Sequence, residues 1–459
     1  DIKVSYDLPF SNDVSESYDL VVVAPKTFSM ILSPLIKHKN NVGVKTLLKT
    51  TEDIYREYDG RDKPEQIKYF IKDAIETWNV KYVLLVGGRK GQRLSWYLPV
   101  RYSNLEVIDW FFNETSYISD LYYADVYKYN QSSGEYEFDD WDSNKNGVFA
   151  EWNRNSSKKD IIDLYPDVHL GRLPCRSRYQ LFVTVRKIIN YETKTYGDDW
   201  YKQMIVGGGD TFTNPYDNDY EGEMEVNLSA SYMSSSGFDI VKLLASDGSL
   251  KRQRDVIKAL NTGAGFVHFA GHGSSLVWST HPPGNDTIWI DALLTFGGIN
   301  FLRNRDRYPG VVVGGCHNSQ FDVTSLNFLI GLREEGLGYF ASWESGNMGS
   351  FAEDTWAPEC WSSKLLAKRN GGGIAVIGNT GLGLNYPGNY TLRGLNGWIN
   401  PRFFYNFARQ SSNILGSVYS QTLNDYISLF DVDRDRSDRK TVEEWVLLGD
   451  PSLKIGGYS

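Results

Sequence analysis

Apolar residues along this chain fall into short continuous runs that are separated by longer amphipathic stretches. Strand-length runs occupy residues 19–25 (DLVVVAP), 45–51 (KTLLKTT) and 81–88 (KYVLLVGG), a pattern typical of buried β-strands. Residues 64–79 (PEQIKYFIKDAIETWN) begin with proline and repeat apolar residues at helical spacing, which predicts an amphipathic helix. Its apolar face comprises Ile67, Phe70, Ile71, Ala74, Ile75 and Trp78. This strand–helix–strand order predicts a parallel sheet between helices.

The second half of the chain repeats the same alternation of strands and helices. One apolar run ends at Asp210, and further runs occupy residues 265–274 (GFVHFAGHGS), 311–318 (VVVGGCHN) and 372–380 (GGIAVIGNT). We therefore predict a three-layer α/β fold with mostly parallel sheets flanked by helices.

The chain is long for a single hydrophobic core, since it has 459 residues. We predict two adjacent subdomains with a boundary near the polar segment GDDWYK, residues 197–202. The N-terminal subdomain would span residues 1–198 and the second subdomain residues 199–459. Residues 90–165 are rich in aromatic and polar residues and lack periodicity, so we expect a functional excursion above the ends of the strands.

Two of the predicted strands in the second half end in a reactive side chain, His272 in GFVHFAGHGS and Cys316 in VVVGGCHN. Ligands of open α/β sheets bind outside the carboxyl ends of the strands, so the two side chains are candidates for one site. Glycines beside them, such as Gly273 and Gly315, leave the backbone amides free to approach a substrate carbonyl. The pattern indicates a cysteine–histidine dyad for acyl transfer.

Other histidines offer weaker alternatives. His268 lies four positions before His272, a spacing that suits zinc on a helix, but the surrounding run is β-like and a half-buried strand histidine is the better interpretation. His317 adjoins Cys316 and should point to the opposite face of its strand, and His281 lies in a loop-like segment. On the residues alone, a histidine and a cysteine at strand ends are more often structural than catalytic.

Composition excludes several classes of protein. The net charge is −9 with no long basic run, which argues against nucleic acid as the main partner. No apolar run approaches the ~20 residues that a membrane span requires. Three cysteines cannot form a disulfide framework, and we interpret Cys175 and Cys360 as small buried hydrophobic residues. The chain begins at Asp1 without methionine, so we expect that an N-terminal segment has been removed.

Residues 139–151 (DDWDSNKNGVFAE) have the chemistry of a calcium loop, because oxygen ligands alternate before a glycine that permits a tight turn. The segment departs from an EF-hand, since Asn153 occupies the twelfth place counted from Asp142. A polar turn is the alternative, and we favour a structural calcium ion. The predicted ligands are Asp140, Asp142, Asn144, Asn146 and Glu151.

Several motifs in a fixed order resemble the catalytic domain of the gingipains, secreted cysteine endopeptidases with a caspase-like fold. They are YVLLVGG from residue 82, DVHLGRL at residues 167–173, the helix that ends in NYE at residue 192, GHGS at the histidine, a small residue before the cysteine, and LLGDPSL near the C-terminus. The resemblance covers most of the chain. It implies a secreted, calcium-stabilised endopeptidase made as a zymogen, and it favours the catalytic interpretation of His272 and Cys316.

Carried over residue by residue, the resemblance makes Cys316 the nucleophile, His272 the general acid/base, and the amides of Gly273 and Cys316 the oxyanion hole. Asp210 corresponds to an acidic residue near the histidine. An acid that selects a basic residue at P1 would come from the segment YEGEME, and Trp343 would form a wall of the S1 pocket. Within YEGEME, Glu221, Glu223 and Glu225 compete, and we select Glu223.

The leading hypothesis is therefore a secreted cysteine endopeptidase that cleaves protein or peptide substrates after Arg or Lys. A transpeptidase or other acyltransferase with the same dyad, and a non-catalytic peptide-binding relative, remain as alternatives. We expect a monomer. An exposed dibasic pair, Lys158-Lys159 in NSSKKD, suggests self-cleavage there during activation.

Overall fold

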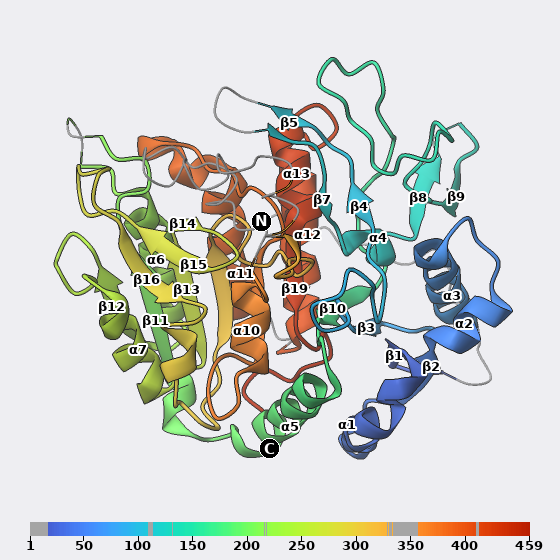
Figure 1. The fold of residues 1–459 in the computed structure, drawn as a ribbon, viewed down its shortest axis with the longest axis horizontal. Helices are drawn as coiled ribbons and strands as arrows, with labels where there is room; N and C mark the ends of the chain where they lie inside the picture. The colour runs from blue at the N-terminus through green and yellow to red at the C-terminus, as the bar shows by residue number, and fades with distance from the viewer. Residues whose placement is uncertain are drawn as a thin grey trace.

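A computed structural model describes residues 17–108, 113–130, 132–214, 216, 218–327, 329, 333, 357–409 and 413–459. Ten strands form one continuous sheet through both halves of the chain (Figure 1), and every described pair is parallel except β18–β19. In spatial order they are β12 (Asp239–Leu244), β11 (Gln203–Gly208), β13 (Phe266–Ala270), β17 (Gly310–Gly314), β18 (Ala375–Asn379), β19 (Trp445–Leu448), β10 (His169–Leu173), β3 (Tyr82–Val86), β1 (Leu20–Ala24) and β2 (Thr46–Thr50).

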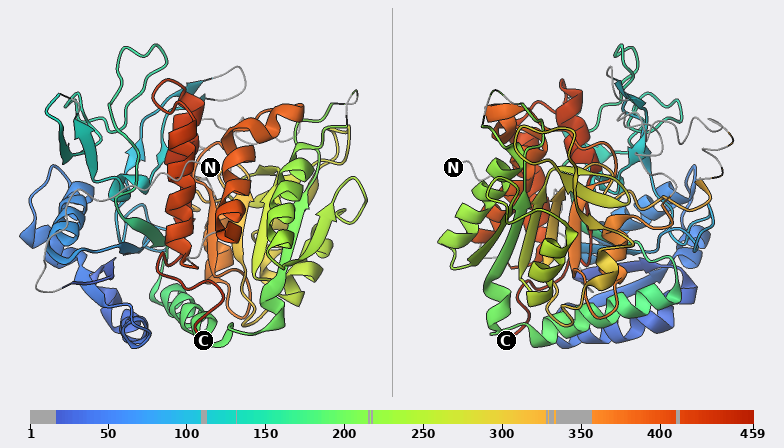
Figure 2. Two further views of the ribbon diagram at one scale, coloured as in Figure 1. Left: turned by 180° about the vertical axis from the view of Figure 1, so that it is seen from behind. Right: turned by 60° about the vertical axis from the view of Figure 1, so that its left-hand side comes forward.

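Helices cover both faces of this sheet, as Figure 2 shows. In the second half, α6 (Glu221–Ser235), α11 (Leu395–Arg409) and α12 (Leu415–Leu429) pack on one face, and α7 (Gln253–Thr262) and α10 (Trp361–Ala367) pack on the other. The second face also carries a small antiparallel sheet of β14 (His272–Gly273), β15 (Val277–Thr280) and β16 (Ile290–Leu294). The predicted three-layer α/β fold is thus confirmed.

The first half has its own helices around β1–β3. They are η1 (Lys26–Phe28), α1 (Ser29–Asn41), α2 (Thr51–Glu57), α3 (Lys63–Trp78) and α5 (Arg178–Lys194). The helix predicted from residue 64 is α3, and it begins at the predicted place because Asp62 accepts a hydrogen bond from the Glu65 amide at 3.0 Å. It ends at Asn79, whose φ of 53° is left-handed.

The boundary predicted at residue 198 falls between α5 and η2 (Asp199–Lys202), just before β11. The sheet does not stop there, because β19 from the C-terminal end of the chain pairs with β18 on one side and with β10 on the other. The division into two subdomains stays a prediction.

The excursion after β3 forms short hairpins that lie over the C-terminal helix α13 (Arg436–Glu444). Ser119 Oγ donates a hydrogen bond to the Glu443 carbonyl at 2.6 Å, and Tyr117 OH donates to the Glu443 carboxylate at 2.7 Å. These contacts explain how a helix as polar as α13 is buried. The excursion contains β4 (Tyr102–Ser103), β5 (Val107–Ile108), β6 (Asn113–Glu114), β7 (Tyr117–Ile118), α4 (Leu121–Ala124), β8 (Tyr127–Asn130) and β9 (Glu135–Phe138).

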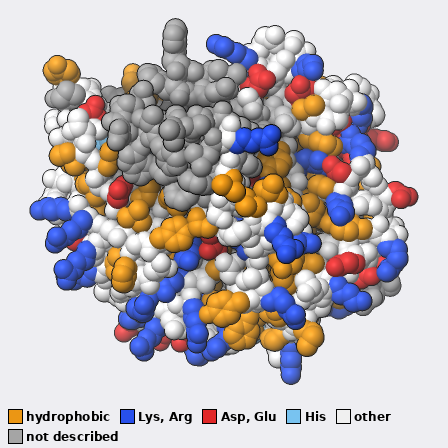
Figure 3. Space-filling view, viewed as in Figure 1, with side chains coloured by type: hydrophobic (Ala, Val, Ile, Leu, Met, Phe, Trp, Pro, Cys, Tyr) orange, Lys and Arg blue, Asp and Glu red, His pale blue; other side chains and the backbone are white. Residues whose placement is uncertain are grey.

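Two short 3-10 helices complete the described elements, η3 (Ile299–Phe301) and η4 (Gly388–Arg393). None of the helices in the described ranges combines the length and apolar character that crossing a bilayer requires. On the face in Figure 3, Lys and Arg side chains are spread over the described surface together with acidic ones.

The register of the central strands sets the level at which functional side chains emerge. Ala270, the last residue of β13, lies opposite Gly314, the last residue of β17. Both strands run in the same direction, so the segments that follow them leave the sheet side by side.

Candidate active site

The segments after β13 and β17 touch through their backbones. A Cβ built on Gly315 would lie only 3.0 Å from Gly273 Cα and 3.1 Å from the His272 carbonyl oxygen. A side chain at either glycine would separate the two segments. The structure therefore brings the predicted dyad residues, His272 and Cys316, to one edge of the sheet on segments in direct contact.

The imidazole of His272 is held by a backbone carbonyl on a third strand end. Its Nε2 lies 2.8 Å from the carbonyl oxygen of Thr211, which follows β11. Because a carbonyl can only accept, Nε2 carries the hydrogen and Nδ1 keeps a lone pair. Burial lowers the pKa of His272 to about 4, so the imidazole is neutral at pH 7 and can accept a proton.

Aromatic rings surround this histidine on its outer side. Trp289 lies 5.1 Å from the His272 ring, His281 lies 5.4 Å away, and Phe212 lies 6.4 Å away. Phe212 and Trp289 are both exposed to solvent. These rings restrict the rotation of His272 and form an apolar wall beside it.

Cys316 is half-buried, and its Sγ lies 3.5 Å from the Gly383 carbonyl oxygen on the segment after β18. Burial and then the nearby Glu444 carboxylate raise the pKa of this thiol to about 12. The resting dyad is therefore a neutral thiol with a neutral imidazole. Cys316 must pass its proton to a base as it attacks, because the thiolate is the nucleophile.

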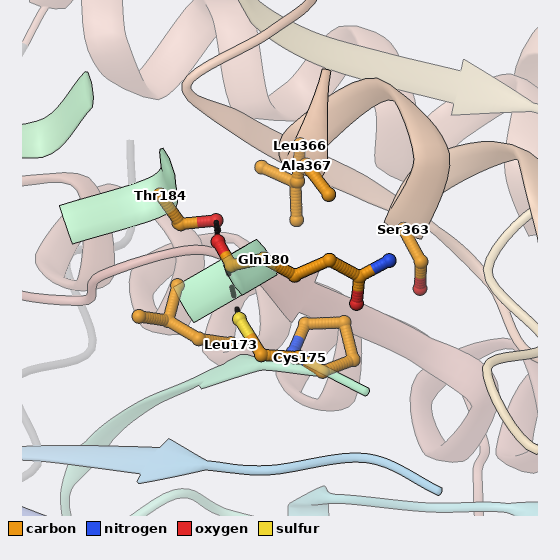
Figure 4. A pocket seen from close by; sticks show the side chains of 8 residues that line it. Leu173, Cys175, Gln180, Thr184, Ser363, Leu366 and Ala367 are labelled. Carbon is orange, nitrogen blue, oxygen red and sulfur yellow. Dashed lines mark hydrogen bonds between the residues drawn. The ribbon is translucent and has the colours of Figure 1, made fainter. Parts of the chain in front are cut away.

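The other two cysteines are buried, as predicted. Cys175 lies in a small internal pocket with its Sγ 3.9 Å from Thr184 Oγ1 (Figure 4). Cys360 lies 3.2 Å from Ser363 Oγ. Burial raises the pKa of both thiols, as it does for Cys316, so what distinguishes Cys316 is that it is only half-buried and lies at the end of a strand, whereas the other two are enclosed.

Asn318, which sequence reasoning missed, links the segment after β17 to the segment after β13. Its Nδ2 donates to the Ser274 carbonyl at 2.7 Å and to the Val277 carbonyl at 2.9 Å, and its side chain is fully buried. Its amide oxygen lies where a Cβ on Gly273 or Gly315 would fall. The only sequence signal was its place in the run GCHN after β17.

Asp210 lies at the end of β11, one residue before Thr211. Its backbone amide donates to the His281 carbonyl at 3.1 Å, and its Oδ2 accepts from the Gly284 amide at 2.7 Å. The carboxylate thus organises the loop that carries His281. The group seen to orient the His272 imidazole is the Thr211 carbonyl.

The three glutamates of the YEGEME segment lie at the start of α6 and are all buried. Glu221 accepts from the amides of Thr211 and Phe212, at 3.1 and 3.0 Å, and from a third amide at residue 388. It therefore supports the loop whose carbonyl holds His272. Glu223, our sequence-based choice for the S1 acid, binds the amide and hydroxyl of Ser246 at 2.8 and 2.6 Å.

Glu225 contacts strand β13 and helix α11 rather than the loop after β11. Its Oε1 accepts from Asn400 Nδ2 at 2.9 Å and lies 3.1 Å from His268 Nε2. His268 is fully buried and also contacts Ser229 Oγ at 2.9 Å, which confirms that it is a structural strand histidine. Trp343, predicted as a wall of the S1 pocket, lies outside the described residues.

The predicted calcium loop carries its own cations. Arg61 contacts Asp142 Oδ2 at 2.6 Å and Asp140 Oδ2 at 3.0 Å, and Lys145 also pairs with Asp140. The remaining predicted ligands contact one another, because the amide nitrogens of Asn144 and Asn146 lie 3.4 and 2.5 Å from the Glu151 carboxylate. Calcium at this loop would have to displace Arg61 and Lys145.

At the start of this loop and beside it, three buried carboxylates each have one oxygen bonded and one oxygen without a hydrogen-bond partner. Asp125 Oδ1, Asp139 Oδ2 and Asp167 Oδ1 are buried and have no hydrogen-bond partner. Burial raises the pKa of Asp163 and of Asp167 to about 7. Across the described ranges, no three Asp, Glu, His or Cys side chains already stand in a metal-binding arrangement. The donors nevertheless have the oxygen chemistry that calcium prefers.

Comparison with known proteins places this geometry among proteases. The sequence profile of peptidase family C25 matches residues 13–456. Lys-gingipain of Porphyromonas gingivalis is 25% identical over 162 residues, which are 35% of this chain and 8% of the relative. Gingipain R2 of the same organism is 21% identical over 447 residues, which are 96% of this chain and 46% of the relative. The chain thus spans less than half the length of these relatives.

Solved structures of gingipains share the fold. The crystal structure of the Arg specific cysteine proteinase gingipain R superposes with a TM-score of 0.61 at 18% identity, over 96% of this chain and 79% of that one. A complex of Porphyromonas gingivalis RgpB pro- and mature domains gives a TM-score of 0.60 at 18% identity, over 95% of this chain and 79% of that one. These similarities confirm the caspase-like fold that the motifs predicted.

Proposed function

Because this chain belongs to peptidase family C25, we propose that it is a cysteine endopeptidase that hydrolyses peptide bonds through Cys316 and His272. The observation that carries the proposal is the contact between the two segments that bear these residues, with His272 Nε2 bonded to the Thr211 carbonyl. That bond leaves Nδ1 of the imidazole as the proton acceptor for the dyad.

Catalysis would begin when Cys316 transfers its thiol proton to Nδ1 of His272 and its sulfur attacks the scissile carbonyl carbon. The carbonyl oxygen becomes an oxyanion, which the backbone amides of Gly273 and Cys316 would stabilise; one such donor is typically worth about 2.7–4 kcal/mol. His272 then gives the proton to the leaving amine, and an acyl-enzyme remains on Cys316. Water, deprotonated by His272, would release the acid product and restore the thiol.

We further propose cleavage after Arg or Lys. Support comes from the names of two similar proteins, a Lys-gingipain and an Arg specific cysteine proteinase. The S1 acid would come from the first turns of α6, where the candidates are Glu221, Glu223 and Glu225.

Calcium is proposed as a structural ion in the excursion. The support is the set of buried carboxylate oxygens without hydrogen-bond partners at Asp125, Asp139 and Asp167, next to the predicted loop. Thermal unfolding with calcium or with a chelator tests this. A calcium-dependent rise in Tm that Asp125→Asn removes and Asp142→Asn retains would assign the ion to the buried carboxylates, and the reverse would assign it to the loop. No rise in Tm would refute calcium binding.

Secretion and a zymogen form are proposed on the same family basis, since one structurally similar protein was solved with pro- and mature domains. The exposed segment around Lys158 is the proposed place of self-cleavage; the Lys158 ammonium lies 3.7 Å from Glu151, and Lys159 stacks on Trp152. Mass spectrometry after activity develops would detect a cut there. An intact chain would refute it. A monomer is proposed and is tested by light scattering.

The decisive test of function is hydrolysis of peptides that differ only at P1 (Arg, Lys, Asp, Asn, Leu), with wild-type protein and with Cys316→Ala. Cleavage after Arg or Lys that disappears in the variant supports the proposal. Cleavage after another residue keeps the enzyme class and refutes the basic preference. Product formed with added amines in place of water would indicate a transpeptidase, and binding without turnover a non-catalytic relative.

A further inference from the structure

A buried cluster of charges lies close to the proposed nucleophile. Its centre is Lys440 of α13, a fully buried side chain whose ammonium lies 2.7 Å from Glu114 Oε2 and also pairs with Glu444 one helical turn later. Lys440 also lies over the Tyr117 ring at 4.0 Å. Glu114 comes from the β5–β6 hairpin of the excursion, so segments more than 300 residues apart in the sequence share one ammonium.

The segment after β18 rests directly on these carboxylates. Both Glu114 oxygens accept from the Leu382 amide, at 3.2 and 3.1 Å. A Cβ on Gly381 would lie 2.7 Å from Glu114 Oε1 and 2.9 Å from Glu444 Oε2, so a side chain at this position would have to push both carboxylates aside. The cluster thus fixes the position of this backbone.

The same backbone contacts the nucleophile segment on its other side. Gly383 offers the carbonyl that lies 3.5 Å from Cys316 Sγ, and the Gly381 carbonyl accepts from the His317 amide at 2.8 Å. The Cys316 thiol therefore contacts the Gly383 carbonyl, and residues 381 and 382 of the same segment contact the buried carboxylates. The Coulomb effects on Cys316 have the expected signs, since Glu444 and Glu114 raise its pKa and Lys440 lowers it.

Two carboxylates share one ammonium in this cluster. Burial, together with the neighbouring Glu114, raises the pKa of Glu444 to about 8, so the cluster is neutral at pH 7 and gains a negative charge above about pH 8. Other charged groups nearby do not change this balance. Arg439 and Glu443 pair with each other at 2.7 Å, and burial lowers the pKa of His317, which keeps that imidazole neutral.

We propose that Glu114, Lys440 and Glu444 are positioning residues of the active site, which hold residues 381–383 against Cys316 and set, by their charge, how readily its thiol loses a proton. This inference deepens the proposed function and makes the excursion part of the catalytic centre.

The experiment measures the rate at which iodoacetamide alkylates Cys316 between about pH 6 and pH 10, since that rate follows the thiolate fraction. Glu114→Gln keeps an oxygen acceptor for the Leu382 amide and removes a negative charge. Lys440→Met removes the positive charge. Above about pH 8 we expect Glu114→Gln to react roughly tenfold faster than wild type and Lys440→Met roughly tenfold slower, because a change of one unit in pKa is a tenfold change in thiolate.

Opposite changes in the alkylation rate of Glu114→Gln and Lys440→Met indicate an effect of charge, because loosened packing would change the rate of both variants in the same direction. Lys440→Arg keeps the positive charge and should react at the wild-type rate. If Lys440→Met does not fold, Glu444→Gln keeps the test decisive: it should match Glu114→Gln above about pH 8 and approach wild type below about pH 7, where Glu444 is already neutral, whereas loosened packing would change the rate at every pH. Glu135→Gln, on the exposed strand β9, is the matched control and should not differ from wild type. Cys316→Ala identifies the labelled thiol.

The inference is overturned if Glu114→Gln and Lys440→Met change the alkylation rate in the same direction, or if no folded variant changes it. The measurement needs no peptide hydrolysis, so its outcome is separate from that of the proposed function. A protein that cleaves no peptide yet shows the opposite shifts would refute the peptidase proposal and keep this one.

Discussion

Gly315→Ala tests whether the contact between the two catalytic segments is required for turnover. In the structure the new Cβ would lie 2.2 Å from Asn318 Oδ1, 3.0 Å from Gly273 Cα and 3.1 Å from the His272 carbonyl oxygen. Non-bonded carbon atoms prefer about 3.5–4.0 Å, so the segment that carries Gly273 must give by up to about 0.5 Å, and the Asn318 side chain, which bonds that segment, must move as well.

A displacement of that size would carry the Gly273 amide away from the oxyanion. Misplacement by about 1 Å costs roughly 100-fold in rate, which agrees with the value of about 2.7–4 kcal/mol for one oxyanion donor. We therefore expect kcat/KM for a peptide with Arg at P1 to fall about 100-fold, with the loss in kcat. The assay is steady-state hydrolysis, and thermal unfolding confirms that the variant is folded.

Gly310→Ala is the matched control, because Gly310 begins the same strand and its new Cβ would meet only Phe266 carbons at 3.6 Å, an ordinary contact. We expect this variant to stay within about threefold of wild type, the range of substitutions without a specific steric cause. If Gly315→Ala also stays within about threefold, the two segments do not form the oxyanion hole and the reasoning is wrong.

Three further predictions concern the support of the dyad. Asn318→Ala removes the donor to the Ser274 carbonyl and one of two donors to the Val277 carbonyl, which keeps the Ser274 amide, and should lower the free energy of unfolding by about 1–3 kcal/mol, measured by denaturant titration; an unchanged midpoint would contradict this. The pKa of His272 is lowered to about 4. On the acid side, kcat/KM should therefore fall only as the pH drops below about 4, where the imidazole gains a proton. A fall centred near pH 6.5 would refute the assignment of this lowered pKa to the catalytic base. Glu221→Gln should reduce kcat about tenfold, the effect of losing one charge-assisted hydrogen bond of about 1.5 kcal/mol, with the order of P1 preference unchanged. Glu223→Gln, which weakens contacts with Ala245 and Ser246 rather than the loop that holds His272, should not reduce kcat. Loss of the preference for Arg in Glu221→Gln would instead make Glu221 the S1 acid.

Much of the fold was determined locally and could be predicted from the sequence. The apolar run before His272 and the one before Cys316 are strands, β13 and β17, because β-branched and aromatic residues in such runs have one stable environment, a buried sheet. Helix α3 begins and ends close to the predicted residues, because Asp62 and Asn79 are neighbours in sequence of the groups that they cap. The placement of His272 and Cys316 at one edge of the sheet was predictable for the same reason, since each lies two residues after the end of its own strand; their role as a catalytic dyad stays a prediction.

The partners of the dyad depend on contacts between segments far apart in the chain, and no local pattern marks them. The carbonyl that holds His272 belongs to Thr211. Because this contact uses the backbone of Thr211, the identity of its side chain does not reveal the role in the sequence. Glu114 reaches the Cys316 segment only because β19 and α13 return from the C-terminal end to lie under the excursion.

Contacts between segments far apart in the chain also decided which carboxylates are paired with cations. Asp140 and Asp142 alternate like calcium ligands in the sequence, yet Arg61, two residues before α3, contacts both, and Lys145 pairs with Asp140. The carboxylates that keep one unbonded oxygen, such as those of Asp125 and Asp167, come from different segments that meet only in the folded protein. Sequence periodicity determined which residues are strands, helices and reactive ends, because those depend on near neighbours. The tertiary structure alone decided what each reactive group touches, because burial and electrostatics depend on distance in space.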